Sequence, residues 1–182
     1  VYDQPTDIAT TIKRAHPDNI VFAVTDIATY NRLGLDSLIG AFNRSEQITV
    51  ICCNDAIYGN KGRTAESAWT WINTTGRRQF IIGEYPHYLA ELAASFKGVA
   101  YGACGALTTP DNYYRTKSYI KNAFQKQIDN AGFSFVEVLC ACFAKYVSNE
   151  TPVDCLRWIQ EKMVAEFPLG EFKNIDSVKR ST

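Results

Sequence analysis

The sequence lacks several features that would assign it to particular classes of protein. It contains no apolar run of about 18 residues, which a membrane-spanning helix requires, and no signal peptide. Lys and Arg together number 19, and Asp and Glu also number 19, so no net charge favours nucleic acid or an anionic membrane surface. We therefore expect a cytoplasmic protein with no nucleic-acid partner and no membrane partner.

Histidine is scarce, and cysteine lacks the pattern of a disulfide scaffold. Only two histidines are present. His16 lies just before a proline at an expected helix end, where a histidine is more often a solvent-exposed residue that ends the helix than a catalytic base. The six cysteines do not have the spacing of a small secreted disulfide-rich protein. We expect reduced, mostly buried thiols, because four of them fall in or beside expected strands: Cys52, Cys53, Cys104 and Cys140.

The stretch from Val21 to Tyr58 predicts a strand, a helix and a second strand. Residues 20–24 and 48–53 are apolar runs of strand length, and residues 35–43 between them carry apolar side chains at helical spacing. Such continuous apolar runs are typical of a parallel sheet that is covered on both faces.

Acidic residues follow both of these strands. Asp26 comes after the first apolar run, and Asn54 and Asp55 come after the second. Parallel α/β sheets bind ligands at the carboxyl ends of their strands. Two carboxylates that converge there suit a hard divalent cation, which takes oxygen ligands and usually shares them with a phosphate.

The rest of the chain continues the alternation of helices and strands. We expect helices at residues 6–15, 87–96 and 109–130, a final helix that contains residues 156–163, and strands at residues 99–104 and 133–139. The expected buried face of the long helix consists of Ile120, Ala123, Phe124 and Ile128. The pattern predicts an α/β fold, a three-layer sandwich with a mainly parallel sheet. We assign residues 1–172 to this domain and residues 173–182 to a polar tail.

A long, turn-rich segment follows the second strand, at residues 58–76. Loops of this length inside a compact domain are usually functional or cover a site. The alternative is a surface loop packed by its own tryptophans, Trp69 and Trp71. Lys61 and Arg63 face either an anionic ligand or solvent.

Three long and unusual strings occur in the carboxyl-terminal half of the chain: FKGVAYGACGALTTPDNYYRTKSYIKNAF, GFSFVEVL and EKMVAEFPLGEFK. On these strings, residues 8–173 resemble the thiamine-diphosphate-binding subunit, usually called beta, of 2-oxoacid:ferredoxin oxidoreductases. The branched-chain 2-ketoisovalerate type is the most similar. The resemblance implies the thiamine-diphosphate-binding fold.

The resemblance also implies a cofactor site at the two strand ends described above. In the family, a Gly-Asp-Gly triplet closes one strand and an Asn-Asn or Asp-Asn pair closes a later one, and together they bind Mg²⁺, which holds the diphosphate. The implied metal ligands are Asp26, Asp55 and the backbone carbonyl of Ile57. The implied cofactor-binding residues are Thr25, Asp26, Ile27, Tyr58, Gly59 and Gly62.

The cofactor motifs depart from the family pattern, whereas the three long strings are intact. Thr25 and Ile27 replace both glycines of the triplet, and a β-branched residue narrows the space for a diphosphate and disfavours a positive φ. The segment Tyr-Gly-x-Thr-Gly-Gly-Gln of the family is YGNKGRT here.

The iron–sulfur motifs of the family are incomplete as well. Cys142 matches a cysteine that binds the cluster in the family, but Phe143 follows it in place of proline. The Cys-Pro-Gly-Cys segment, which is amino-terminal in the family, is absent from this sequence. One matching thiolate cannot hold a four-iron cluster, so we do not expect an iron–sulfur cluster from this chain alone.

The implied function is that of a subunit of a hetero-oligomeric oxidoreductase. Such an enzyme converts a 2-oxoacid into an acyl-CoA by oxidative decarboxylation, using thiamine diphosphate and Mg²⁺. The implied partners are an alpha-type subunit, ferredoxin, the 2-oxoacid and coenzyme A. No catalytic residue is assigned to this chain, because the alpha subunit supplies the glutamate that activates the cofactor.

The altered motifs keep a second hypothesis open. In this alternative the chain is a cofactor-free pseudoenzyme or assembly subunit that retains the fold and the partner interface. A Rossmann-type dinucleotide site is excluded, because no Gly-x-Gly-x-x-Gly follows a strand.

Overall fold

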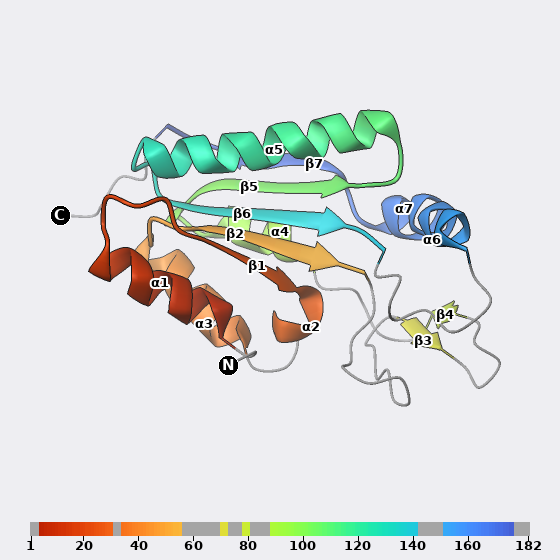
Figure 1. Ribbon diagram of the computed structural model, residues 1–182, viewed down its shortest axis with the longest axis horizontal. Helices are drawn as coiled ribbons and strands as arrows, with labels where there is room; N and C mark the ends of the chain where they lie inside the picture. Colours follow the sequence, from red (N-terminus) through yellow and green to blue (C-terminus); the bar gives the residue numbers. More distant parts are fainter. Residues whose placement is uncertain are drawn as a thin grey trace.

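A five-stranded sheet forms the centre of the protein in a computed structural model, which describes residues 4–30, 34–55, 70–72, 78–80, 88–141 and 151–176. The strand order is β1-β2-β6-β5-β7 (Figure 1). Four strands run parallel: β1 (Phe22–Asp26), β2 (Thr49–Asn54), β5 (Val99–Ala106) and β6 (Phe133–Leu139). A separate antiparallel pair consists of β3 (Thr70–Ile72) and β4 (Arg78–Phe80).

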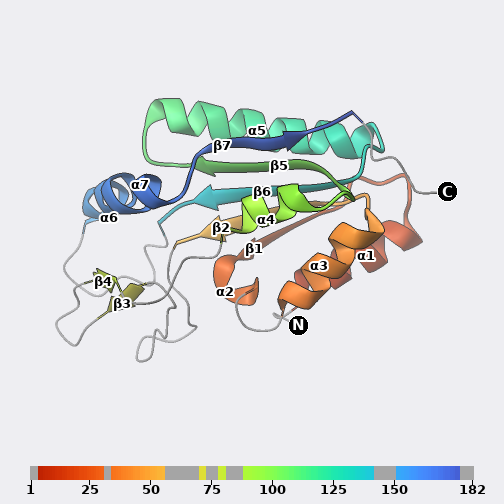
Figure 2. The same cartoon turned by 180° about the vertical axis from the view of Figure 1, so that it is seen from behind.

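Helices cover both faces of the sheet. On one face, α3 (Leu35–Arg44) and α4 (Leu89–Ser95) pack on the strands, and α1 (Pro5–Ala15) lies beside α3 (Figure 2). On the other face, α5 (Pro110–Ile128) packs on β5 and β6. The short helices α2 (Ile27–Thr29), α6 (Pro152–Trp158), η3 (Ile159–Met163) and α7 (Val164–Glu166) lie at the carboxyl end of the sheet (Figure 1). The predicted α/β sandwich with a mainly parallel sheet is therefore confirmed.

Aromatic side chains hold α3 and α4 against the sheet. Phe42 of α3 has no exposed surface, and its ring centroid lies 5.0 Å from that of Phe133 and 6.2 Å from that of Phe135, both on β6. The ring of Phe96, which follows α4, lies 5.2 Å from Phe42 on another side. This cluster holds α3 and the end of α4 against β6, the strand that pairs with β2.

The buried face of α5 agrees only in part with the prediction, because Ala123 is buried and Ile120 and Phe124 are half-buried, as expected, but Ile128 is not covered. Its fully buried residues are Thr116, Ala123 and Gln127, whereas Ile128 is 54% exposed. Gln127 is buried because its amide is fully used. Its oxygen accepts from the Val21 N–H (2.7 Å), and its nitrogen donates to the Val21 carbonyl (2.9 Å) and to the Thr49 hydroxyl (3.0 Å). These bonds offset the cost of burying the amide.

The sheet has an antiparallel edge strand that the sequence analysis did not predict. β7 (Gly170–Asn174) pairs with β5, so Lys173 and Asn174 lie within the sheet although we assigned them to the polar tail. Glu171 of this strand accepts hydrogen bonds from the Tyr101 hydroxyl of β5 and from Asn122 of α5. Backbone pairing with β5, these polar contacts and the packing of Phe172 on the core together hold β7, so this strand forms without an apolar run.

The opposite edge of the sheet also departs from prediction. We expected residues 20–24 to be covered on both faces, but β1 buries Ala23 and leaves Phe22 and Val24 exposed. The side of β1 that faces α1 is covered, whereas on the side that faces α5 Phe22 contacts only the edge of the Phe124 ring and stays half exposed.

Candidate cofactor-binding site

The carboxyl ends of β1 and β2 lie side by side. In the register of this parallel pair, Asp26 is opposite Cys53, and Asn54 and Asp55 follow directly on β2 (Figure 1). The hydrogen bond from Cys140 lowers the pKa of the Cys53 thiol, and the nearby charges of Asp55 and Asp26 oppose that effect only in part. The structure thus brings the two predicted metal ligands to the same edge of the sheet, and their role as ligands stays a prediction.

Asp26 is exposed and is held in place by the short helix that follows it. It is the N-cap of α2, and its Oδ1 accepts from the backbone N–H and from the hydroxyl of Thr29, both at 3.0 Å. A carboxylate at an N-cap satisfies backbone donors that otherwise lack partners. The local sequence Asp-x-x-Thr therefore fixes the orientation of this carboxylate at the sheet edge.

Ile27 replaces a glycine of the family motif, but its side chain does not fill the surface beside Asp26. It has no exposed surface and belongs to the hydrophobic core. Its backbone is helical, within α2, and does not require a positive φ. The preceding residue, Thr25, is half-buried. The bulk that we expected to narrow the site is thus directed into the protein.

Glu137 holds Asn54, the last residue of β2, in place, and no motif in the sequence had indicated this residue. Its carboxylate accepts from the Asn54 side-chain amide at 2.7 Å and from the Ala90 backbone N–H at 3.1 Å. Only 1% of Glu137 is exposed, and burial raises its pKa to about 7, although the two hydrogen bonds partly offset that effect. The signal in the sequence was an acid within an otherwise apolar strand, FSFVEVL.

Two thiols lie on the same face of this edge. Cys140 follows β6, and its backbone N–H donates to the Asn54 carbonyl at 3.0 Å. The Cys140 thiol donates a hydrogen bond to Cys53, which lowers the pKa of Cys53 to about 7 and raises that of Cys140. The described cysteines are all free: Cys52, Cys104 and Cys155, which are buried, and Cys53 and Cys140, which are half-buried.

Two carboxylates at this edge, those of Asp26 and Asp55, are the predicted ligands of a cation that is shared with a phosphate. Among the described residues, no group of three or more His, Cys, Asp or Glu side chains could hold a metal ion. Mg²⁺, however, is usually bound through one or two carboxylates and completes its shell with phosphate and water oxygens. Asp26 and Asp55 offer such a pair.

Other predicted site residues lie outside the part of the chain that the structure describes, so the predictions about them stay predictions. They are Ile57, Tyr58, Gly59, Gly62 and Cys142. No helix in the described ranges is long and apolar enough to span a bilayer.

The profile of one protein family matches most of the chain. The profile of the thiamine pyrophosphate enzyme, C-terminal TPP binding domain, matches residues 6–138. The chain therefore belongs to this family of thiamine-pyrophosphate-binding domains, and thiamine pyrophosphate is the same compound as thiamine diphosphate.

Particular relatives agree with this assignment. The chain is 29% identical over 172 residues to the ketoisovalerate oxidoreductase subunit VorA of Methanothermobacter thermautotrophicus, an alignment that covers 92% of this chain and 35% of VorA. It is 27% identical over 163 residues to the 2-oxoglutarate synthase subunit KorB of the same organism, covering 88% of this chain and 54% of KorB. The chain thus spans about a third of the first relative and about half of the second.

The fold is shared with a solved oxidoreductase. The 2-oxoglutarate:ferredoxin oxidoreductase from Magnetococcus marinus superposes with a TM-score of 0.63 at 15% identity, covering 97% of this chain and 62% of that chain. At this identity, the similarity supports the fold alone.

Proposed function

We propose that this chain is the thiamine-diphosphate-binding part of a 2-oxoacid:ferredoxin oxidoreductase. In this role it takes part in the oxidative decarboxylation of a 2-oxoacid to an acyl-CoA. Its family and its relatives support the proposal. The observation that carries it is the placement of Asp26 and Asp55 at one edge of the sheet.

The described residues would bind and orient the cofactor. Asp26 and Asp55 would hold Mg²⁺, and through it the diphosphate, while the bond from Asn54 to Glu137 keeps the second strand end in place. Thiamine diphosphate, when bound, supplies a carbon nucleophile for the 2-oxo carbon and an acceptor for the electron pair that carbon dioxide leaves behind. The backbone carbonyl of Ile57 would be the third protein ligand.

The rest of the enzyme would come from other polypeptides or domains. An alpha-type subunit would supply the acid that activates the cofactor, ferredoxin would take the electrons, and coenzyme A would take the acyl group. The names of both relatives refer to a 2-oxoacid, ketoisovalerate in one and 2-oxoglutarate in the other, which supports a 2-oxoacid as the substrate class.

The test is an activity assay of the assembled enzyme. With this chain and its alpha-type partner, we expect 2-oxoacid-dependent and coenzyme A-dependent reduction of ferredoxin that requires thiamine diphosphate and Mg²⁺. Asp55→Ala should reduce the rate at least about 100-fold, because an electrostatic contact of several kcal/mol is lost. Glu161→Ala, at an exposed position on η3, should leave the rate unchanged.

A second outcome would favour a different function. If the assembly forms but the wild-type protein neither reduces ferredoxin nor binds thiamine diphosphate, the chain is an assembly subunit that keeps the fold without the cofactor. The replaced glycines at Thr25 and Ile27 are the sequence feature that motivates this control.

A further inference from the structure

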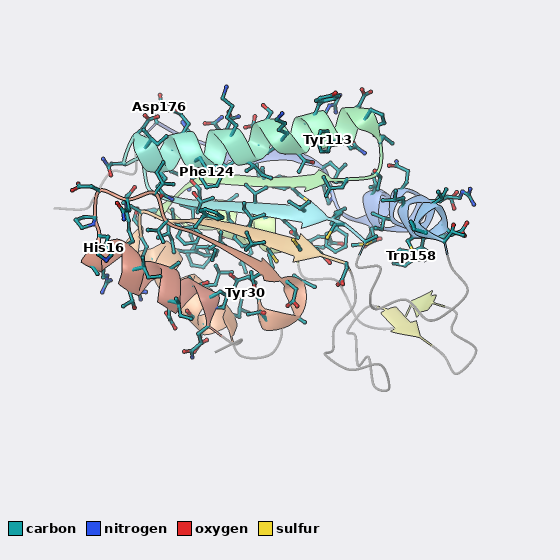
Figure 3. The ribbon with its side chains drawn as sticks, in the orientation of Figure 1. His16, Tyr30, Tyr113, Phe124, Trp158 and Asp176 are labelled. Carbon is teal, nitrogen blue, oxygen red and sulfur yellow. The ribbon has the colours of Figure 1, made fainter. Side chains whose placement is uncertain are left out.

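Two half-buried thiols, those of Cys53 and Cys140, lie next to each other where β2 and β6 end. These strand ends lie between α2 and the helix α6, which carries Trp158 (Figure 3). Cys53 pairs with Val138 in the parallel register, and Cys140 follows Val138 by two residues, so both side chains are on the same face. The Cys140 thiol donates a hydrogen bond to Cys53, which places the two sulfur atoms side by side. We call this pair the edge dithiol.

Two other described cysteines, Cys52 and Cys104, do not have this arrangement. Both pair with Glu137 in the register, so β6 separates them, and two strand spacings amount to about 10 Å. A disulfide requires Cα atoms within about 7 Å of each other. Cys52 and Cys104 are also only 0% and 2% exposed. The edge dithiol therefore combines the proximity and the access to solvent that these two buried cysteines lack.

A low-molecular-weight disulfide oxidises such a pair by thiol–disulfide exchange. One thiolate of the pair attacks a sulfur atom of the reagent, the S–S bond of the reagent breaks, and the first thiol leaves. The other thiolate then attacks the mixed disulfide, a bond forms between the two protein sulfur atoms, and the second thiol leaves. The protein loses two electrons and two protons, and the two released thiols carry them away.

The edge dithiol lies beside the two predicted metal ligands. Asp26 is opposite Cys53 in the register of β1 and β2, and Asp55 follows Cys53 by two residues. The backbone N–H of Cys140 donates to the Asn54 carbonyl, which connects the second thiol to the same strand end. A covalent bond between two sulfur atoms is shorter than a hydrogen bond between them, so closing the pair draws the ends of β2 and β6 together. The position of Asp55 then changes relative to Asp26.

We propose that Cys53 and Cys140 form a redox switch of the candidate cofactor site, in which a reversible disulfide between them weakens the binding of Mg²⁺ and thiamine diphosphate. The switch rests on the proposed function, whereas formation of the disulfide does not. In the reduced state, Asp26 and Asp55 hold the cation. Oxidation shifts the end of β2, and a thiol reductant reverses the change.

The first measurement maps the disulfide in the assembled protein. After incubation with oxidised glutathione, free thiols are blocked with N-ethylmaleimide, and the tryptic peptides are analysed by mass spectrometry without reduction. The peptides of residues 45–61 and 127–145 should appear as one linked pair. Cys53→Ala and Cys140→Ala should each abolish the link. Because the same peptides contain Cys52 and Cys142, the matched controls are Cys52→Ala and Cys142→Ala, which should keep it.

Calorimetric titration with thiamine diphosphate and Mg²⁺ supplies the second readout. Oxidation should raise the Kd of wild type at least about tenfold, and dithiothreitol should restore it. In the variant that carries both Cys53→Ala and Cys140→Ala, the same treatment should leave the Kd unchanged.

Three results would overturn the proposal: absence of the linked peptides, a link that persists in Cys53→Ala or Cys140→Ala, or an unchanged Kd of the oxidised wild type. A different result would identify failure of the proposed function. If the disulfide forms but the reduced protein binds no thiamine diphosphate, the proposed function is wrong, and the switch is overturned with it.

Discussion

The buried carboxyl of Glu137 connects three elements at the scale of a single residue. It lies on β6, accepts from Asn54 at the end of β2, and accepts from the Ala90 N–H in the first turn of α4. A buried carboxyl that titrates near neutral pH makes stability depend on pH. Glu137, which supports Asn54 at the candidate site, should therefore also make the stability of the fold depend on pH.

We expect this titration to be visible in the unfolding free energy. Burial raises the pKa of Glu137 from 4.5 to about 7, so the folded state binds the proton more tightly than the unfolded state. The stabilisation is complete below about pH 4.5 and is lost as the pH rises through 7. Between pH 5 and pH 8, wild type should lose roughly 2–3 kcal/mol relative to Glu137→Gln, which cannot titrate. Urea unfolding at both pH values measures the difference, and parallel pH profiles for the two proteins would contradict it.

The sequence was sufficient to predict the two carboxylates of the candidate site, but not the residues that hold them in place. Asp26 and Asp55 were predicted because each directly follows an apolar run, which is a local signal. Glu137 lies 82 residues beyond Asp55 in the chain, and only the pairing of β2 with β6 brings it to Asn54. Likewise, the inward direction of the Ile27 side chain depends on α2, a single turn that the pattern of apolar residues did not predict.

At the scale of the elements, the backbone of α3 packs closely against the loop that precedes β5, at Gly98. A Cβ built on Gly98 would lie 1.9 Å from the Phe42 carbonyl oxygen, which belongs to the backbone of α3. A Cβ on Gly40, within α3, would meet only the end of the flexible Arg44 side chain. These two glycines therefore provide a matched pair.

Gly98→Ala should destabilise the protein by about 3 kcal/mol or more, because the backbone of α3 or the loop must move. Gly40→Ala should be neutral or stabilising by up to about 1 kcal/mol, because alanine favours the helix interior. Thermal unfolding of both variants checks this pair. Equal stability of the two would show that the loop does not pack against α3 as described.

Gln127 connects α5 to the beginning of β1 and to β2 through its side-chain amide. We expect Gln127→Leu to cost about 2–4 kcal/mol, because it leaves the Val21 N–H buried without its partner. The control is Gln125→Leu, at an exposed position two residues earlier, which should change stability by less than about 0.5 kcal/mol. Denaturant unfolding of both variants is the measurement. A small effect at Gln127 would mean that water replaces the amide.

Most helices and strands were predictable, and the exceptions share a cause. Strands β2, β5 and β6 carry local apolar runs, and α5 begins at the predicted Thr109-Pro110 signal, where the Thr109 hydroxyl accepts from the Asn112 N–H. β7 was missed because Tyr101 and Asn122, distant in sequence, hold it through Glu171. The buried face of α5 was predicted only in part, because the burial of Gln127 depends on Val21, just before β1, and on Thr49 of β2.

At the scale of the whole molecule, the sequence indicated a parallel sheet but not its strand order. The order β1-β2-β6-β5-β7 places the two earliest strands at one edge and the last strand at the other. The edge strand β1 leaves Phe22 and Val24 exposed, and the carboxyl edge of the sheet holds Asp26 and Asp55. The candidate cofactor site thus lies where the two strands at this side of the sheet end.

The central claim is that the carboxyl ends of β1 and β2 bind a cation that holds a diphosphate. Calorimetric titration of the assembled protein with thiamine diphosphate and Mg²⁺ tests it most directly. We predict saturable binding by wild type and by Glu161→Ala, and its loss in Asp26→Ala and Asp55→Ala. Absence of binding by wild type at high ligand concentration, or undiminished binding by both aspartate variants, would contradict the claim.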